Sequence, residues 1–241
     1  MLRIENLTKH YKGSNKGVTD LSLHVMPGDI YAFIGHNGAG KTTALKCIAG
    51  IHNFDNGEIY IGGVSLAANT LACKKTFAYI PDNPDIYEYL TGIQYLNFIA
   101  DVFGVPARER EERITKYADA FEITSSLGDL ISAYSHGMKQ KLAIISALVH
   151  RPKLMILDEP FVGLDPKAAV ILKDIMREIC EAGGAIFFST HVLDVAEKLC
   201  NKVAIIKDGR LLVSGNMNDI VKDGYSLEDI FMEVAAGAKR D

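Results

Sequence analysis

The segment that most constrains the fold of this chain runs from Gly35 to Thr42. It reads Gly35-His36-Asn37-Gly38-Ala39-Gly40-Lys41-Thr42 and fits the pattern G-x-x-x-x-G-K-[ST]. Glycines let the backbone curl until successive N–H groups point at one anion. The segment lies between a predicted strand, Asp29–Ile34, and a predicted helix, Thr42–Gly50. It therefore predicts a nucleoside triphosphate site, without deciding among kinases, GTPases and ATPases.

The residues at the end of this loop indicate how phosphates and a metal ion would be held. A helix that begins near Lys41 would direct the positive end of its dipole at the phosphates. Lys41 would hold the β- and γ-phosphates, and Thr42 would offer its hydroxyl to Mg²⁺. The hydroxyl of Thr43 would lie near the α-phosphate.

Strand and helix patterns alternate along the rest of the chain, which favours a mainly parallel sheet covered by helices. Apolar or alternating runs predict further strands at Thr19–Val25, Gly57–Ile61, Thr76–Ile80, Leu154–Leu157, Ala185–Ser189 and Val203–Ile206. Helical patterns cover Gly92–Phe103, Ala107–Phe121, Ser135–Val149, Lys167–Glu181 and Val192–Leu199. The pair Asp208-Gly209 predicts a hairpin that leads into Leu211–Val213.

We therefore expect a single α/β domain with a P-loop NTPase core, a mainly parallel sheet, a small antiparallel β-subdomain and an inserted helical subdomain. The core and β-subdomain should span about residues 1–82 and 152–215, and the helical subdomain about 83–151. A helical tail should fill 216–241. Its apolar stripe should cover the core, with regulation or dimerisation as alternatives; the stripe consists of Leu227, Ile230, Phe231 and Val234.

Composition narrows the class of protein. Apolar residues make up 48% and charged residues 23% of the chain, and the formal net charge is −4, so nothing marks a nucleic-acid partner. The first residues lack the apolar core of a signal peptide, and no apolar run approaches the roughly 20 residues that cross a bilayer. The four cysteines lie far apart, so we expect free thiols and a cytoplasmic location. Any action on a membrane would require a partner.

A second group of candidate residues follows a later strand. Leu154–Leu157 is apolar throughout, as a strand buried in a parallel sheet is, and Asp158 and Glu159 come directly after it. Because ligands bind at the carboxyl ends of such strands, Asp158 should reach Mg²⁺ and Glu159 should polarise the attacking water. His191 ends the next predicted strand and would bond the γ-phosphate or this water.

Further segments resemble motifs of the ABC-transporter ATPases. Tyr134-Ser135-His136-Gly137-Met138-Lys139-Gln140-Lys141 resembles the family's signature, usually written LSGGQ, and comes about twenty residues before Asp158. Phe161–Asp165 resembles the family's D-loop, and Ser189–His191 resembles its switch histidine. Tyr11 stands where the family stacks an aromatic ring on adenine, with Val18 as a second adenine contact.

This resemblance implies an ATPase that uses ATP and Mg²⁺ and pairs head to tail with a second ATP-binding subunit, identical or different. Each ATP would lie between the phosphate loop of one subunit and Ser135 and Gly137 of the other. A hydroxyl, a backbone N–H and a helix N-terminus all suit an anion there. The resemblance further implies separate transmembrane permease subunits, which would hold the chain at the inner face of the cell membrane, and no nucleic acid.

The chain departs from the family pattern at several positions. Tyr134, His136 and Met138 replace the usual Leu, Gly and Gln of the signature. Asp82 stands where the family usually has a Gln that contacts Mg²⁺ and senses the membrane partner. An ionised Asp accepts hydrogen bonds but cannot donate them. We expect Asp82 to reach Mg²⁺ through a water molecule, and the alternative is that it only caps a loop.

The branch of the family that serves multidrug and antibiotic exporters is the most similar, on the strength of Met138–Gln140, Leu90–Gly92 and Ser226–Phe231. Export is therefore the expected direction of transport. The main alternative is a relative that acts on DNA or the ribosome, although such proteins usually carry coiled-coil insertions, zinc modules or tandem ATPase units, which this sequence lacks. An unrelated kinase or GTPase would have no use for Ser135–Gly137.

Overall fold

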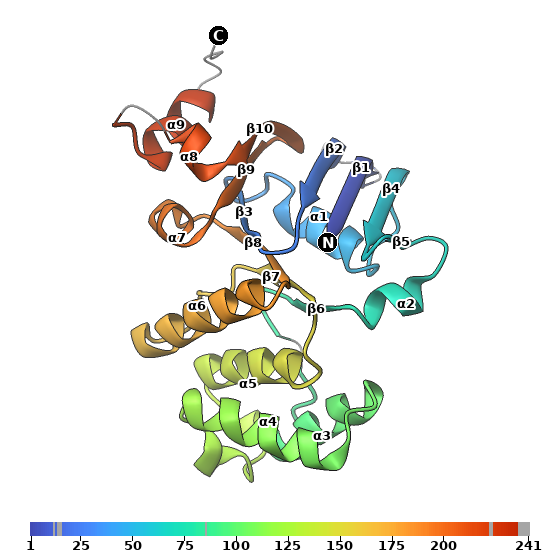
Figure 1. The fold of residues 1–241 in the computed structure, drawn as a ribbon, viewed down its shortest axis with the longest axis vertical. Helices are drawn as coiled ribbons and strands as arrows, with labels where there is room; N and C mark the ends of the chain where they lie inside the picture. Colours follow the sequence, from blue (N-terminus) through green and yellow to red (C-terminus); the bar gives the residue numbers. More distant parts are fainter. Residues whose placement is uncertain (12, 14–15, 85, 222–223, 236–241) are drawn as a thin grey trace.

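The computed structural model describes residues 1–11, 13, 16–84, 86–221 and 224–235, so residues 236–241 of the predicted tail lie outside it. Figure 1 shows two sheets with helices beside and below them. The strands are β1 (Leu2–His10), β2 (Gly17–Val25), β3 (Ile30–Ile34), β4 (Asn56–Ile61), β5 (Val64–Ser65), β6 (Phe77–Ile80), β7 (Leu154–Asp158), β8 (Ala185–Thr190), β9 (Lys202–Lys207) and β10 (Arg210–Asn216). The α-helices are α1 (Lys41–Ile48), α2 (Thr70–Lys74), α3 (Gly92–Val102), α4 (Ala107–Ala120), α5 (His136–Val149), α6 (Pro166–Glu181), α7 (Leu193–Leu199), α8 (Met217–Ile220) and α9 (Leu227–Ala235). Two short 3₁₀ helices are η1 (Thr124–Ser126) and η2 (Ile131–Ala133).

The larger sheet has the strand order β10-β9-β3-β8-β7-β6. Its strands from β9 to β6 run parallel, and β10 pairs antiparallel with β9. The predicted hairpin connects these last two strands, with φ of 49° at Asp208 and 76° at Gly209, as a two-residue hairpin turn requires. The expected mainly parallel α/β fold is confirmed. Because β3, β7 and β8 are neighbours, the residues that follow them meet at one edge of the sheet.

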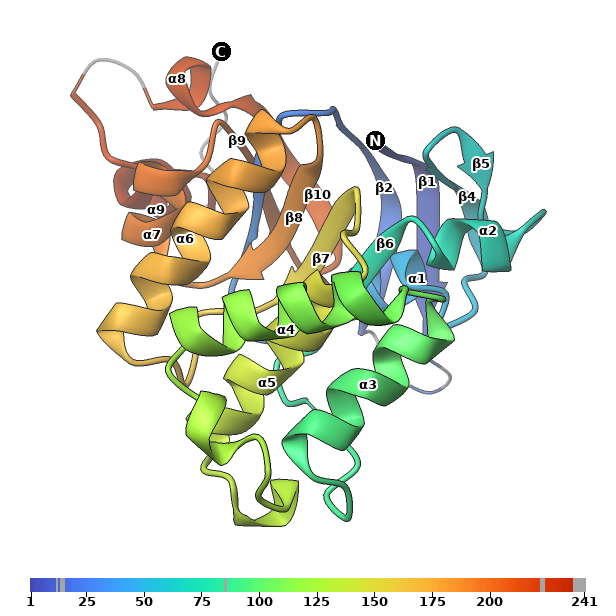
Figure 2. The ribbon, with the colours of Figure 1, turned by 60° about the horizontal axis from the view of Figure 1, so that its bottom comes forward.

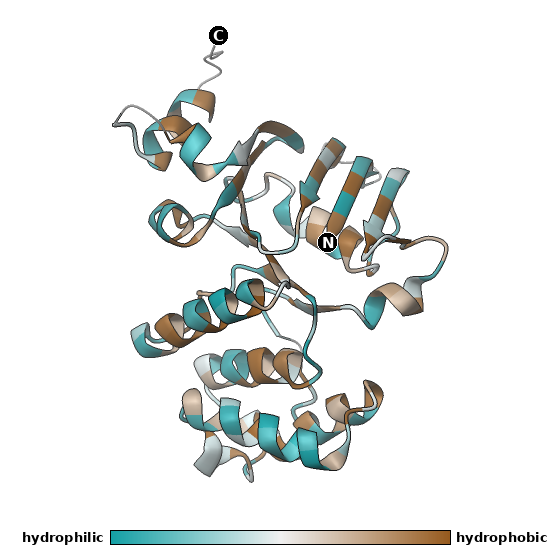
Figure 3. Cartoon of the chain, viewed as in Figure 1, coloured by the Kyte–Doolittle hydropathy of each residue, from teal (hydrophilic) through white to brown (hydrophobic). Residues whose placement is uncertain are grey.

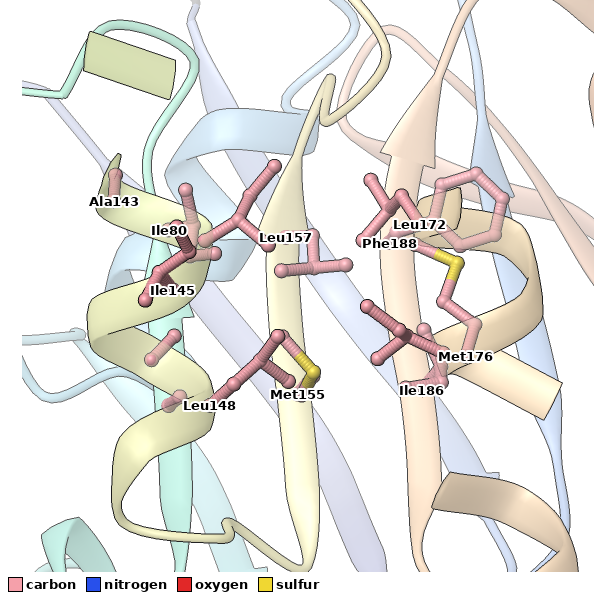
Figure 4. Packing of buried hydrophobic residues seen from close by; sticks show 14 of the residues in the cluster. Ile80, Ala143, Ile145, Leu148, Met155, Leu157, Leu172, Met176, Ile186 and Phe188 are labelled. Carbon is pink, nitrogen blue, oxygen red and sulfur yellow. The ribbon is translucent and has the colours of Figure 1, made fainter. Parts of the chain in front are cut away.

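Both faces of this sheet are covered, which explains why its central strands are apolar at every position. Alternate residues of β3 enter opposite clusters. Ala32 packs with residues of α5 and α6, and Phe33 packs with α1 and the smaller sheet. Figure 4 shows Met155 and Leu157 of β7 with side chains of α5 on one side and of β8 and α6 on the other.

The smaller sheet is antiparallel, with the order β2-β1-β4-β5. Sequence patterns did not predict β1. Its first half alternates, with Leu2 and Ile4 buried, but the next buried apolar residue is Leu7. The pairing shifts register between Ile4 and Leu7, where Asn6 has φ of 51°. This bulge breaks the period of two that marks a strand.

Helices α3, α4 and α5 lie together at the end of the molecule below β6 and β7 (Figures 1 and 2). A capping box starts α3, in which Thr91 accepts from the N–H of Gln94 while the Gln94 side chain accepts from the N–H of Thr91. Helix α4 is mostly hydrophilic (Figure 3) and buries Ile114 and Ala118. This group fits the expected helical subdomain, whose limits at residues 83 and 151 stay a prediction.

The tail and the cysteines agree with expectation. Leu227, Ile230 and Phe231 of α9 are buried in the core, so the apolar stripe does cover it. The four cysteines are all buried free thiols; they are Cys47, Cys73, Cys180 and Cys200. Within the described residues, no helix combines the length and the apolar character that a membrane span requires.

Candidate functional site

The phosphate loop connects the carboxyl end of β3 to the N-terminus of α1. Its glycines are required by geometry, since Gly38 and Gly40 have φ of 82° and 108°. A Cβ atom on Gly40 would lie 2.5 Å from the carbonyl oxygen of Gly17, and one on Gly35 would lie 2.5 Å from that of Ile206. The loop is thus held tightly against β2 and β9, with its outer turn at His36 and Asn37 exposed.

The ammonium group of Lys41 lies over this loop and is nearly buried. It donates to the carbonyl oxygen of Gly35 at 2.6 Å and to that of His36 at 3.4 Å. Its Nζ atom is 3.6 Å from a carboxylate oxygen of Glu159. The Lys41 ammonium group therefore lies between the loop and the end of β7, where the phosphates of a nucleotide would be expected.

A pocket of about 230 Å³ opens along the loop. It brings together most of the residues predicted from sequence, and it also includes Lys16 and Gly17, which were not predicted. Its lining residues are Tyr11, Lys16, Gly17, His36, Asn37, Gly38, Gly40, Lys41, Thr42, Thr43, Asp82, Asp158 and Glu159. Within the loop itself, Gly35 and Ala39 are buried and do not line the pocket.

The two residues predicted to contact adenine lie in different environments. Tyr11 lines the pocket, is 38% exposed, and has its hydroxyl 3.4 Å from that of Thr43. Val18 is fully buried and sits against Gly40, so it offers no surface to the pocket. Strict alternation from Leu21, Leu23 and Val25 would turn Val18 outward, but Asp20 has φ of 54° and the pairing with β1 shifts register there, so Val18 is buried in the core. The adenine contact of Val18 stays a prediction. Gly17, the preceding residue, lines the pocket instead.

Asp158 has the environment of a metal ligand. Its side chain is buried, one carboxylate oxygen accepts from the hydroxyl of Ser189, and the other oxygen has no hydrogen-bond partner among the described residues. Burial raises the pKa of Asp158, while the hydroxyls of Ser189 and Thr42 oppose this shift and the charge of Asp82 adds to it. An unpartnered oxygen among hydroxyl and carboxylate groups fits Mg²⁺, which prefers oxygen ligands. The expected ligands Thr42, Asp158 and Asp82 all line the pocket.

The sequence left two roles open for Asp82, a loop cap and a water-mediated contact with Mg²⁺; the first is seen in the structure, and the second stays a prediction. One of its carboxylate oxygens accepts from the backbone N–H of Asn83 at 2.9 Å, so it does cap a turn. The same residue also lines the pocket and lies near enough to Asp158 to influence its pKa. A loop cap and a water-mediated metal contact are therefore compatible at this position.

Glu159 and His191 are brought together at the ends of β7 and β8. Glu159 has φ of 47°, and its backbone N–H donates to Ser189, at 3.0 Å to the hydroxyl and 3.2 Å to the carbonyl oxygen. Its side chain is 15% exposed and lies 3.0 Å from Nδ1 of His191, whose side chain is 51% exposed. A mostly buried carboxylate beside an imidazole and an ammonium group is well placed to orient water and accept its proton.

The signature residues lie apart from this pocket. Ser135 caps α5, with its hydroxyl oxygen accepting from the N–H of Met138 at 3.3 Å, and neither Ser135 nor Gly137 lines the pocket. The ring of His136 lies over Gly163, where a Cβ atom would come within 2.5 Å of it. Lys141 forms an ion pair of 2.7 Å with Asp165. The start of α5 is thus joined to the loop that follows Glu159, which sequence patterns did not predict.

A family model described as "ABC transporter" matches residues 18–162. An uncharacterized ABC transporter ATP-binding protein of Bacillus subtilis, YthP, is 35% identical over 231 residues, which cover 94% of this chain and 93% of the relative. The chain belongs to the ABC transporter family. It is an ATP-binding member and an ATPase of that family, as the sequence predicted.

Solved structures of ABC proteins share the fold. One, described as the structure of an ATP binding subunit of an ABC transporter, has a TM-score of 0.93 and 35% identity, and the match covers 98% of this chain and 99% of that one. Another is described as a dimeric post-hydrolysis state of the ATP-binding cassette MJ0796 bound to ADP and Pi. It has a TM-score of 0.82 at 20% identity, with coverage of 90% and 99%.

Proposed function

We propose that this ABC protein is the ATPase subunit of a transporter whose membrane-spanning subunits are separate chains, and that two ATP-binding subunits close around two ATP molecules to drive transport. The observation that carries this proposal is the separation of Ser135 and Gly137 from the pocket that contains the phosphate loop. One chain then holds two half-sites, and hydrolysis requires a second subunit.

The side chains at the pocket support a division of roles. Lys41 would turn from the carbonyl oxygens of the loop to the β- and γ-phosphates, since phosphate oxygens are charged acceptors and form stronger bonds. Thr42, Asp158 and Asp82 would hold Mg²⁺, which would neutralise phosphate charge. Glu159 would orient the attacking water and accept its proton, while His191, 3.0 Å away, would hold this carboxylate and contact the γ-phosphate.

Ser135 and Gly137 would complete the site of the other subunit. The Ser135 hydroxyl uses its oxygen to cap α5, so its proton remains available for a phosphate oxygen. The backbone N–H of Gly137 and the N-terminus of α5 add two more groups that attract an anion. A Cβ atom on Gly137 would come within 2.8 Å of the Gly163 carbonyl oxygen, which explains the need for glycine there.

An aromatic surface supports a docking site for the permease. It consists of the exposed residues Tyr87, Tyr89 and Phe98. The ring centroid of Tyr87 lies 5.8 Å from that of Tyr89 and 5.7 Å from that of Phe98. A groove of about 310 Å³ lies at the neighbouring Tyr95 and extends to Tyr79 and His150. The occupant that fits is an apolar cytoplasmic helix of the permease. The segment that begins at Asp82 would connect this surface to the nucleotide pocket.

This function places the chain at the inner face of the cell membrane, held there by the permease. Export is the direction we propose, on the resemblance of Met138–Gln140 and Ser226–Phe231 to the exporter branch. The subunit would act without nucleic acid.

The decisive experiment co-expresses the chain with candidate permeases and measures ATP and GTP hydrolysis by the purified complex in lipid vesicles. The proposal expects co-purification, a preference for ATP, and stimulation by the permease that is lost when Tyr87 and Tyr89 are both changed to Ser. ATP-stimulated binding to DNA or ribosomes, without association with a permease, would contradict it.

A further inference from the structure

Helix α9 of the C-terminal tail contacts the outer turn of the phosphate loop. The ring of Phe231 meets that of His36 edge to face, with centroids 4.8 Å apart and planes at 60°. Edge-to-face rings at this separation attract each other beyond the area that they bury. His36 also lines the nucleotide pocket, so one side chain touches both the site and the tail.

Residues of α9 other than Phe231 fix this helix to the core. Leu227 and Ile230 are fully buried, and the backbone N–H of Leu227 donates to a carboxylate oxygen of Glu197 on α7 at 2.7 Å. Helix α7 begins two residues after His191, and α9 lies beside α7 in Figure 2. Helix α9 is therefore anchored to the helix that follows the switch histidine, His191.

A second cavity of about 540 Å³ lies between these parts. The loop, the start of α7 and α9 all contribute to its lining, which is Gly35, His36, Asn37, His191, Leu193, Glu228, Phe231 and Met232. Motion of the loop would therefore change the contact of Phe231 with His36, and motion of His191 would change the cavity beside Phe231. The cavity leaves room for such motion, whereas a filled interface would prevent it.

We propose that Phe231 is a positioning residue, which holds His36 and so sets the position of the outer turn of the phosphate loop. ATP affinity then depends on α9, and α9 responds to bound nucleotide. This inference rests on the nucleotide site of the proposed function. It adds a coupling between that site and the tail, beyond the cover of the core that the apolar stripe provides.

A tryptophan reporter tests the coupling directly. The chain has no Trp, so Phe231→Trp creates a single fluorophore beside the loop. A non-hydrolysable ATP analogue with Mg²⁺ should change the fluorescence emission of this Trp. The analogue concentration at half of the change should agree with the dissociation constant that calorimetry measures. Leu71→Trp on α2, which is exposed and lines neither pocket, should not respond and serves as the matched control.

Substitutions test the positioning role. Phe231→Ala should weaken ATP binding about two- to tenfold and raise KM with little change in kcat, while Phe231→Tyr should stay near wild type. His36→Ala should have a similar effect, and the double variant should be no worse than either single one.

Three results decide between the proposals. The role of α9 would be overturned if the effects of Phe231→Ala and His36→Ala on ATP binding were fully additive. It would also be overturned if the fluorescence of Phe231→Trp did not change although calorimetry showed that this protein binds the analogue. Either result would leave the nucleotide site intact. If Phe231→Ala does not fold, the Trp reporter still decides. Absence of analogue binding to the wild-type chain would overturn both proposals.

Discussion

Replacing Glu159 with Gln removes a negative charge and a proton acceptor while it keeps the shape of the side chain. Its carboxylate lies 3.0 Å from His191 Nδ1 and 3.6 Å from Lys41 Nζ, so it is the group best placed to take a proton from water. Its backbone is held by Ser189, and these bonds survive the substitution. Loss of a general base typically slows a reaction by roughly 10²–10⁴, which raises the barrier by about 3–5 kcal/mol.

The assay is phosphate release at saturating Mg²⁺-ATP, with ATP binding measured separately by calorimetry. The substitution removes a carboxylate from a site that receives phosphates, so ATP affinity should stay equal or increase, and dimers should accumulate with ATP. Glu111→Gln, on the exposed face of α4, is the matched control and should leave hydrolysis unchanged. Turnover of Glu159→Gln at the wild-type rate would refute the assignment, and loss of ATP binding would show that Glu159 mainly positions Lys41.

Two further outcomes follow from other parts of the structure. Changing Asp82 to Ala should raise the Mg²⁺ concentration for half-maximal hydrolysis about tenfold, since residues that hold metal-bound water contribute to metal affinity on that scale. An unchanged Mg²⁺ requirement would leave Asp82 as a loop cap only. Burial lowers the pKa of His150 from 6.5 to about 4, so the unfolded chain takes up the proton first as pH falls, and stability is lost below pH 6.5. Between pH 7 and pH 5 the free energy of unfolding should fall by about 2 kcal/mol through this residue, and urea unfolding of His150→Gln should lack that component.

Local spacing made the main elements of the site predictable. The phosphate loop follows the apolar strand β3, and Asp158 and Glu159 stand at the end of the apolar run of β7. Neighbouring parallel strands bring these ends to one edge of the sheet. The hairpin at Asp208 and Gly209 was predictable for the same reason, because two adjacent residues with positive φ define the turn.

Features that depend on distant parts of the chain were not predictable. The bulge at Asn6 hides the alternation of β1, and the irregularity at Asp20 of β2 buries Val18, which strict alternation would have turned outward. The contacts of His36 with Phe231 and of His136 with Gly163 join segments whose sequences carry no shared pattern. Such pairs are set by how helices pack on the sheet, which single-sequence patterns do not encode.

The division of the ATP site between two subunits can be tested by mixing two inactive variants. Lys41→Ala disables the phosphate loop, and Ser135→Asp keeps a good helix cap while it sets a negative charge against the phosphate of the other subunit. Each variant alone should hydrolyse almost no ATP. An equal mixture should regain about a quarter of the wild-type rate, because half of the dimers are mixed and each mixed dimer has one intact site. A mixture no more active than its components, or full activity of Ser135→Asp alone, would contradict a site shared between subunits.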